Sequence, residues 1–210
     1  MKIDLHIHSK YSYDSFLSPE TIIRIAKKRR LDGVAVTDHG TIKGGIEALK
    51  INKDKDFQVI VGAEIKTEYG DVIGIFLNEE IKSQIFMQVV EEIRGQDGLV
   101  VLAHPFRKGI TFPTDLLKWV DLVEGFNARS RKGDNKRAYG LARKFKKPMT
   151  GGSDAHLGFE IGRGRTIVNS EVKGELRKGE TKIEGEESSY YLVHGLSVTM
   201  ERVKGKGLIR

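Results

Sequence analysis

The sequence predicts an α/β fold built on a mainly parallel sheet. Short apolar segments alternate with helical segments at about 25–30 residues per unit, which is typical of α/β proteins. Residues 34–37 are almost wholly apolar, as expected of a strand that is buried on both faces of a parallel sheet. Several strands end in His, Asp, Glu or Asn, and the carboxyl ends of parallel strands meet at one face of a barrel.

The expected elements follow from apolar periodicity and turn residues. Ser18 is suited to cap a helix that has Pro19 in its first turn and continues to about residue 30. The strands are expected at 1–6, 34–37, 57–65, 71–77, 98–103, 122–126, 149–152 and 165–168. Further helices are expected at 44–50, 81–94, 116–120 and 135–146. Beyond residue 173 the alternation decays, and 188–193 and 196–203 read as two closing strands or a poorly ordered tail.

Length and composition narrow the class of protein. The 210 residues suggest one domain, with a core of about 1–172 and a C-terminal extension, 173–210, that packs on it or trails from it. The chain has no cysteine, so any metal must be held by nitrogen and oxygen ligands. No apolar run approaches the ~20 residues of a membrane span and the N-terminus lacks a signal-peptide core, so we expect a cytoplasmic protein.

The charge pattern indicates the kind of partner. Charged residues make up 31% of the chain, which is typical of a thermophile's surface. The net charge of +7 favours anionic partners such as phosphate esters or nucleic acid, although a lysine-rich solvated surface gives the same balance. The basic segment 173–182 contains two glutamates and is interpreted as solvated.

Five of the six histidines lie at the ends of predicted strands, and only His194 does not. The five are His6, His8, His39, His104 and His156, and they are accompanied by Asp38, Glu64 and Asp154. Burying so many polar groups without partners would cost several kcal/mol, which bound metal ions would remove. Imidazole and carboxylate are suitable ligands for Zn, Mn and Fe. Alternate residues of a strand point to the same face, so His6 and His8 can hold one ion.

Five segments together resemble the PHP (polymerase and histidinol phosphatase) family. They are DLHIHSKYSYDS (4–15), TDHG (37–40), GAEI (62–65), AHPF (103–106) and GGSDAH (151–156). The resemblance implies a distorted (β/α)7 TIM-like barrel with a metal site at the C-terminal ends of its strands. It also implies two or three divalent ions and the hydrolysis of phosphate esters.

The resemblance assigns ligands position by position. His6, His8, Glu64 and Asp154 match the ligands of a first metal ion. Glu64 would bridge to a second ion, which His104 also binds, with Asn127 or Glu124 as the candidate for a further ligand. Asp14, His39 and His156 match a third site. Asp38 is expected to orient His39 or to approach the metals.

The expected mechanism uses a metal-activated hydroxide, because a bound ion lowers the pKa of water to roughly 7. A metal-bound water, or protonated His39 or His156, would then supply a proton to the leaving group. Arginine forms bidentate contacts with phosphate, and Arg107, Arg129 and Arg163 follow strand ends. These three are the candidate phosphate-binding residues.

The leading interpretation is a metal-dependent phosphoesterase. Its substrate would be a nucleotide, an oligonucleotide end or a small phosphomonoester. One alternative is a metal-dependent hydrolase of another bond type, since one fold hosts several chemistries. Another is a non-catalytic barrel that binds nucleic acid or a protein partner. The sequence leaves the metal's identity and the oligomeric state open.

Overall fold

A computed structural model describes residues 1–109 and 111–205, and it confirms the α/β class. Nine strands form a single sheet in the order β7-β6-β5-β4-β3-β2-β1-β8-β9. The strands are β1 (Lys2–Ile7), β2 (Gly33–His39), β3 (Gln58–Thr67), β4 (Gly70–Ile75), β5 (Leu99–Leu102), β6 (Leu122–Asn127), β7 (Met149–Gly152), β8 (Gly164–Ile167) and β9 (Lys182–Gly185).

The sheet curls until β7, at one edge, lies beside β1 and β8 near the other edge, so that it forms a nearly closed barrel. Just beyond β7, Ile7 and Ala155 form a parallel bridge, and the Asp154 N–H donates to the His6 carbonyl at 2.8 Å. On the other side of β7, the Gly151 N–H donates to Thr166 Oγ1 at 2.8 Å. These contacts bring the residues that follow β7 beside the end of β1.

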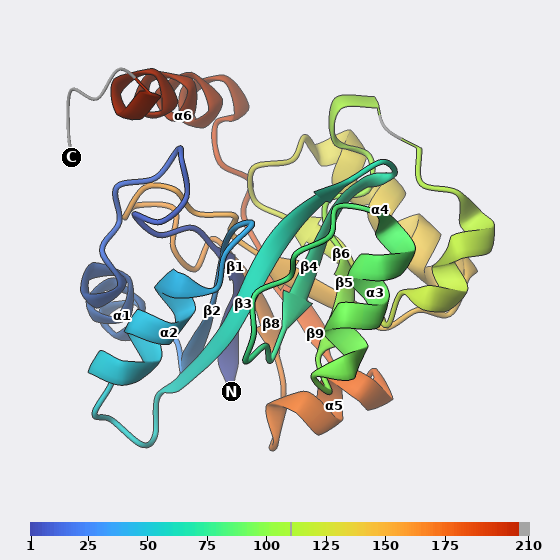
Figure 1. Ribbon diagram of the computed structural model, residues 1–210, viewed down its shortest axis with the longest axis horizontal. Helices are drawn as coiled ribbons and strands as arrows, with labels where there is room; N and C mark the ends of the chain where they lie inside the picture. Colours follow the sequence, from blue (N-terminus) through green and yellow to red (C-terminus); the bar gives the residue numbers. More distant parts are fainter. Residues whose placement is uncertain (110, 206–210) are drawn as a thin grey trace.

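Helices lie around the outside of the barrel and at its two ends (Figure 1). They are α1 (Pro19–Lys28), α2 (Lys43–Ile51), α3 (Phe86–Gly95), α4 (Lys132–Lys144), α5 (Val172–Lys178) and α6 (Tyr190–Gly205), with short 3₁₀ turns at Arg107–Gly109 and Thr114–Trp119. The first helix begins as expected, because the Ser18 side chain accepts from the Thr21 N–H. The helix expected at 81–94 begins five residues later, at Phe86.

Apolar residues from the strands fill the barrel, and α5 closes one end. Ile3, Leu5, Ile73 and Val101 belong to one buried cluster together with Leu176 of α5. The register of β1 shifts between Asp4 and Ile7. This bulge explains how Leu5 reaches the apolar interior while His6 and His8 also turn toward the barrel mouth.

The expectation of a mainly parallel sheet was wrong. Four strand pairs are parallel (β1–β2, β2–β3, β5–β6 and β6–β7) and four are antiparallel (β1–β8, β3–β4, β4–β5 and β8–β9). The cause for β4 is local. Only Glu68 and Tyr69 separate β3 from β4, and a connection that short joins antiparallel strands.

The C-terminal segment was also interpreted wrongly. Residues 188–193 and 196–203 are not two strands, because 190–205 form the single helix α6. Its Val193 and Ser197, four residues apart on one face, are buried. The segment 173–185 is likewise ordered, as most of α5 and all of β9. Residues 206–210 lie outside the described part, and a single domain over 1–210 stays a prediction.

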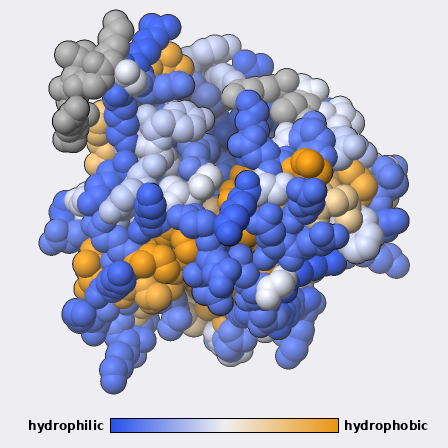
Figure 2. Space-filling view, in the orientation of Figure 1, coloured by the Kyte–Doolittle hydropathy of each residue, from blue (hydrophilic) through white to orange (hydrophobic). Residues whose placement is uncertain are grey.

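The face shown in Figure 2 is mostly hydrophilic, with apolar side chains gathered over α2, where Leu49 and Ile51 are exposed. Within the described ranges, no helix is both long and apolar enough to cross a membrane.

Candidate metal centre

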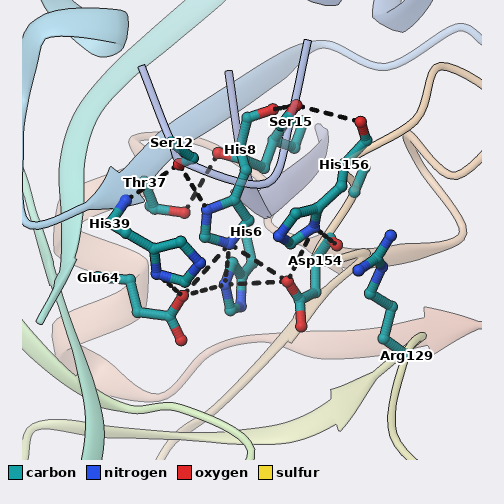
Figure 3. Close-up of polar contacts among 12 residues, drawn as sticks. His6, His8, Ser12, Ser15, Thr37, His39, Glu64, Arg129, Asp154 and His156 are labelled. Atoms are coloured by element: carbon teal, nitrogen blue, oxygen red, sulfur yellow. Dashed lines mark hydrogen bonds and ion pairs between the residues drawn. The ribbon is translucent and has the colours of Figure 1, made fainter. Parts of the chain in front are cut away.

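Four side chains from three strand ends converge at the barrel mouth (Figure 3). The Nε2 atoms of His6 and His8 lie 3.1 Å apart at the end of β1. Glu64 Oε2, from β3, lies 3.4 Å from the first and 3.3 Å from the second. Asp154 Oδ1, just beyond β7, lies 3.6 and 3.2 Å from the same two nitrogens. The residues expected to hold the first ion therefore do meet.

A hydrogen bond behind the site fixes the tautomer of a neutral His6 ring. Its Nδ1 lies 2.9 Å from Glu124 Oε1, a carboxylate oxygen that only accepts. The proton of a neutral His6 ring is therefore on Nδ1, and Nε2 presents a lone pair to the mouth. This is the arrangement in which a metal-ligating histidine is usually found.

His8 is oriented through a serine. Ser12 Oγ donates to Asp38 Oδ1 at 2.7 Å, so it accepts from His8 Nδ1 at 3.1 Å. The Nε2 lone pair of His8 thus also faces the mouth. Asp38 was expected to orient His39 or to approach the metals. Instead its oxygens accept hydrogen bonds from Ser9 and Ser12, behind the metal centre. Asp38 therefore acts on the site indirectly, by orienting Ser12, which accepts from His8.

The lone pairs of two imidazole nitrogens and two carboxylate oxygens face one point. They repel one another unless a proton or a metal ion lies between them. Burial alone lowers the pKa of His8, but the hydrogen bonds that its protonated ring donates to Asp154 and Glu64 outweigh burial and raise the pKa to about 9. The centre therefore attracts positive charge. Neutral imidazole nitrogens with carboxylate oxygens are the donor set that Zn, Mn and Fe ions take.

A second group contains Asp14, His39 and His156, together with His8. His156 Nδ1 faces the Asp154 carbonyl at 2.8 Å, while its Nε2 faces Asp14 Oδ2 at 2.9 Å. Burial lowers the pKa of His156 to about 3, so the ring carries one proton for two acceptors. Asp14 Oδ1 is buried without a hydrogen-bond partner. A cation between His156 and Asp14 would give the ring nitrogen and the unpaired Asp14 oxygen a common partner.

The third group contains one residue that the sequence did not indicate. His104 Nε2 lies 2.8 Å from Glu64 Oε1, as expected of two ligands of one ion. Asp71 joins them, with ligand atoms within 4.8 Å of one another. Burial raises the pKa of Asp71, and the charge of Glu64 acts in the same direction. Asp71 was missed because β4 is antiparallel, so its beginning and not its end lies at the mouth.

The two candidates for a further ligand at this group are both engaged in hydrogen bonds. Glu124 accepts from His6 through Oε1 and from the His104 N–H through Oε2 at 2.9 Å. Asn127 Oδ1 accepts from Arg107 at 2.7 Å and from the Arg129 N–H at 2.9 Å. Both side chains therefore support the candidate ligands through hydrogen bonds. Asp71 is the better candidate for the further oxygen ligand of this group.

Two of the candidate ligands have an unusual backbone. His104 has φ of +25° and Asp154 has φ of +55°, in the region that side-chain-bearing residues seldom adopt. Such conformations persist where the surroundings impose them, and they cluster at functional sites. Here hydrogen bonds to Glu124 and His6 hold the two backbones in place.

The three candidate arginines have different environments. Arg107 reaches the centre, where its Nη2 donates to Asp154 Oδ2 at 2.5 Å. Arg129 is buried and makes two 2.7 Å hydrogen bonds to Glu160, so its charge is already paired. Arg163 does not line the cavity at the mouth, and it donates to the Glu187 carbonyl. Of the three, Arg107 is the one that contacts a candidate metal ligand.

A cavity of about 690 Å³ opens above the centre. Its walls include Asp14, His39, Glu64, His104 and Asp154. His194, the one histidine set apart by the sequence, lines it as well, because α6 crosses the mouth. That volume is in the range of small-molecule sites, roughly 300–1,000 Å³.

Comparisons with known proteins agree with this geometry. The PHP domain profile matches residues 4–157. The uncharacterized protein MJ1587 of Methanocaldococcus jannaschii is 40% identical over 146 residues, which are 63% of this chain and 85% of that protein. MJ0417 of the same organism is 33% identical over 173 residues, 77% of this chain and 68% of that protein.

A solved structure shares the fold. It is a two-domain protein from Bacteroides vulgatus that contains a predicted PHP-like metal-dependent phosphoesterase, with a TM-score of 0.78 at 18% identity. The match covers 89% of this chain and 65% of that one, so this chain spans less than two thirds of that relative. From the matched profile and the converging motifs together, the chain belongs to the PHP domain family.

Proposed function

We propose that the protein hydrolyses a phosphate ester with the help of divalent ions. The substrate would be a nucleotide, an oligonucleotide end or a small phosphomonoester. One observation carries the proposal: imidazole nitrogens and carboxylate oxygens converge on common points beside Arg107, at the floor of a cavity of small-molecule size.

Three ligand groups would hold the ions. They are His6, His8, Glu64 and Asp154; Glu64, His104 and Asp71; and Asp14, His39 and His156. Bound ions would lower the pKa of water toward 7 and offset the charge of the phosphoryl oxygens. The surrounding side chains would hold these ligands in place. Glu124 holds His6 and His104, and Ser12 together with Asp38 holds His8.

Arg107 is proposed to bind the phosphate. Its side chain is 15% exposed, and its Nη2 is held by Asp154 and Asn127. Its Nε–H is buried without a hydrogen-bond partner. Arg107 lines the cavity, and a guanidinium offers parallel donors that match phosphate geometry.

His39 is the better placed of the two expected proton donors. Its side chain is 25% exposed at the cavity and stacks on Tyr13, with ring centroids 4.6 Å apart. His156 is unsuited to the role, because its side chain is buried and burial lowers its pKa. We therefore assign the proton transfer to the leaving oxygen to His39 in the protein with two ions, because a His39 ring that binds a third ion has no proton to give on that nitrogen.

The test is a panel of phosphate esters and carboxamides assayed with Mn²⁺, Zn²⁺ or Fe²⁺. Wild-type protein should hydrolyse at least one phosphomonoester, and Glu64→Gln should lower kcat about 10³-fold or more because it removes a charged ligand shared by two groups. Glu91→Gln, an exposed change on α3, is the matched control and should keep full activity. Turnover of amides alone would favour the alternative hydrolase, and binding of ions without any turnover would contradict the proposal.

A further inference from the structure

Helix α6 crosses the barrel mouth and forms one wall of the cavity. It lies at the top of Figure 1, above the loop that follows β1. His194, Ser197, Val198 and Glu201 line the cavity. Their spacing of three, four and seven residues places them on one face of the helix. The opposite walls of the same cavity carry the candidate metal ligands.

The middle of α6 is attached to one side of the mouth. Arg129 Nη1 donates to Ser197 Oγ at 2.8 Å. Arg129 is itself fixed by its two hydrogen bonds to Glu160, and both of these side chains are buried. At the start of the helix, the guanidinium of Arg131 lies 4.5 Å from the centre of the Tyr190 ring.

The end of α6 is attached to the other side of the mouth by one residue, Lys204. Its Nζ donates to the carbonyls of Lys10 at 2.9 Å, Ser12 at 2.5 Å and Ser15. An ammonium group has three protons, so all of its donors are used on this loop. The Phe16 ring, with its centre 5.0 Å from Nζ, adds a cation–π contact.

We propose that α6 is a fixed wall that makes the site selective for small phosphate esters and chain ends over internal phosphodiesters, and that Lys204 is the positioning residue that holds it. This inference rests on the proposed function. With α6 attached on both sides of the mouth, a compact ester fits the 690 Å³ cavity. A continuous nucleotide chain would have to pass through the space that the helix occupies.

The experiment compares Lys204→Met with Arg202→Met, a change at an exposed position of the same helix. Two substrates are used, p-nitrophenyl phosphate and a circular single-stranded oligonucleotide, which has only internal diesters. Lys204→Met should raise kcat/KM for the circle relative to p-nitrophenyl phosphate by about tenfold or more, while Arg202→Met leaves the ratio unchanged. Amide hydrogen exchange over 190–205 should accelerate by about tenfold or more in Lys204→Met only.

Val198→Trp tests the wall from the opposite direction, because it adds volume to the cavity side of α6. It should lower kcat/KM for a mononucleotide about tenfold relative to p-nitrophenyl phosphate. Faster exchange in Lys204→Met with unchanged substrate ratios in both variants would overturn the role of α6 in selectivity. Unchanged exchange would overturn the role of Lys204. If wild-type protein cleaves no ester, the proposed function fails, while the exchange data still decide whether Lys204 holds the helix.

Discussion

Glu124→Gln should weaken metal binding at the centre without changing its shape. In the native protein Glu124 Oε1 accepts from His6 Nδ1 at 2.9 Å, and Oε2 accepts from the His104 N–H at 2.9 Å and from Asn127 Nδ2 at 3.0 Å. Glutamine has only one acceptor oxygen for these three donors. Its NH₂ group must therefore face either one donor, that of His6, or two donors, those of His104 and Asn127.

When the NH₂ group faces His6, one hydrogen bond is lost. When it faces His104 and Asn127, two are lost, and each unpaired group costs about 1–3 kcal/mol. The amide should therefore turn its NH₂ group to His6. The His6 proton then moves to Nε2, where it occupies the lone pair that faces the mouth. Losing such a partner of a metal ligand typically costs 10- to 100-fold in metal affinity, or about 1.4–2.7 kcal/mol.

Isothermal titration calorimetry with Zn²⁺ and Mn²⁺ measures the affinity, and ¹H–¹⁵N correlation spectra of the imidazole rings report the tautomer of His6. Glu91→Gln, at an exposed position, is the control and should match wild type in both. An affinity within twofold of wild type, with the proton of His6 still on Nδ1, would refute the reasoning.

Three other changes test separate parts of the structure. Asp71→Asn should remove about one ion per chain, as measured by elemental analysis. It should also weaken the spin coupling between Mn²⁺ ions, as measured by electron paramagnetic resonance. An unchanged ion count would exclude Asp71 as a ligand. Arg107→Met should raise KM for a phosphomonoester about tenfold or more, and an unchanged KM and kcat would remove Arg107 from the phosphate site. Arg129→Met leaves the carboxylate of Glu160 buried without its cationic partner, so urea unfolding should show a loss of about 3–5 kcal/mol. The double change with Glu160→Gln keeps an acceptor for the His156 and Leu157 N–H groups and should recover part of the loss. Equal stability of the single and double variants would contradict that pairing.

The strand ends were predictable because two kinds of information coincide there. An apolar run identifies a strand, and a polar residue directly after it identifies the mouth. This is how His6, His8, Glu64, His104 and Asp154 could be grouped although they lie up to 148 residues apart, and the structure brings them together. The PHP resemblance added the order in which they share ions.

The misses came from features that depend on three-dimensional context. Asp71 precedes its strand, and only the antiparallel direction of β4 carries it to the mouth. The bulges in β1 and β6 decide which side chains turn inward, and register shifts leave no clear sequence signal. Helix α6 contains Gly195 and several β-branched residues, which weaken the helical signal, and it is held by the long-range contacts of Ser197 and Lys204.

The measurement that tests the central claim most directly is anomalous X-ray diffraction from crystals soaked in Mn²⁺. We expect peaks between His6, His8, Glu64 and Asp154, and between Glu64, His104 and Asp71, with a further peak beside Asp14, His39 and His156 if three ions bind. Crystals that show no peak at the mouth, or peaks only at surface carboxylates, would contradict the account.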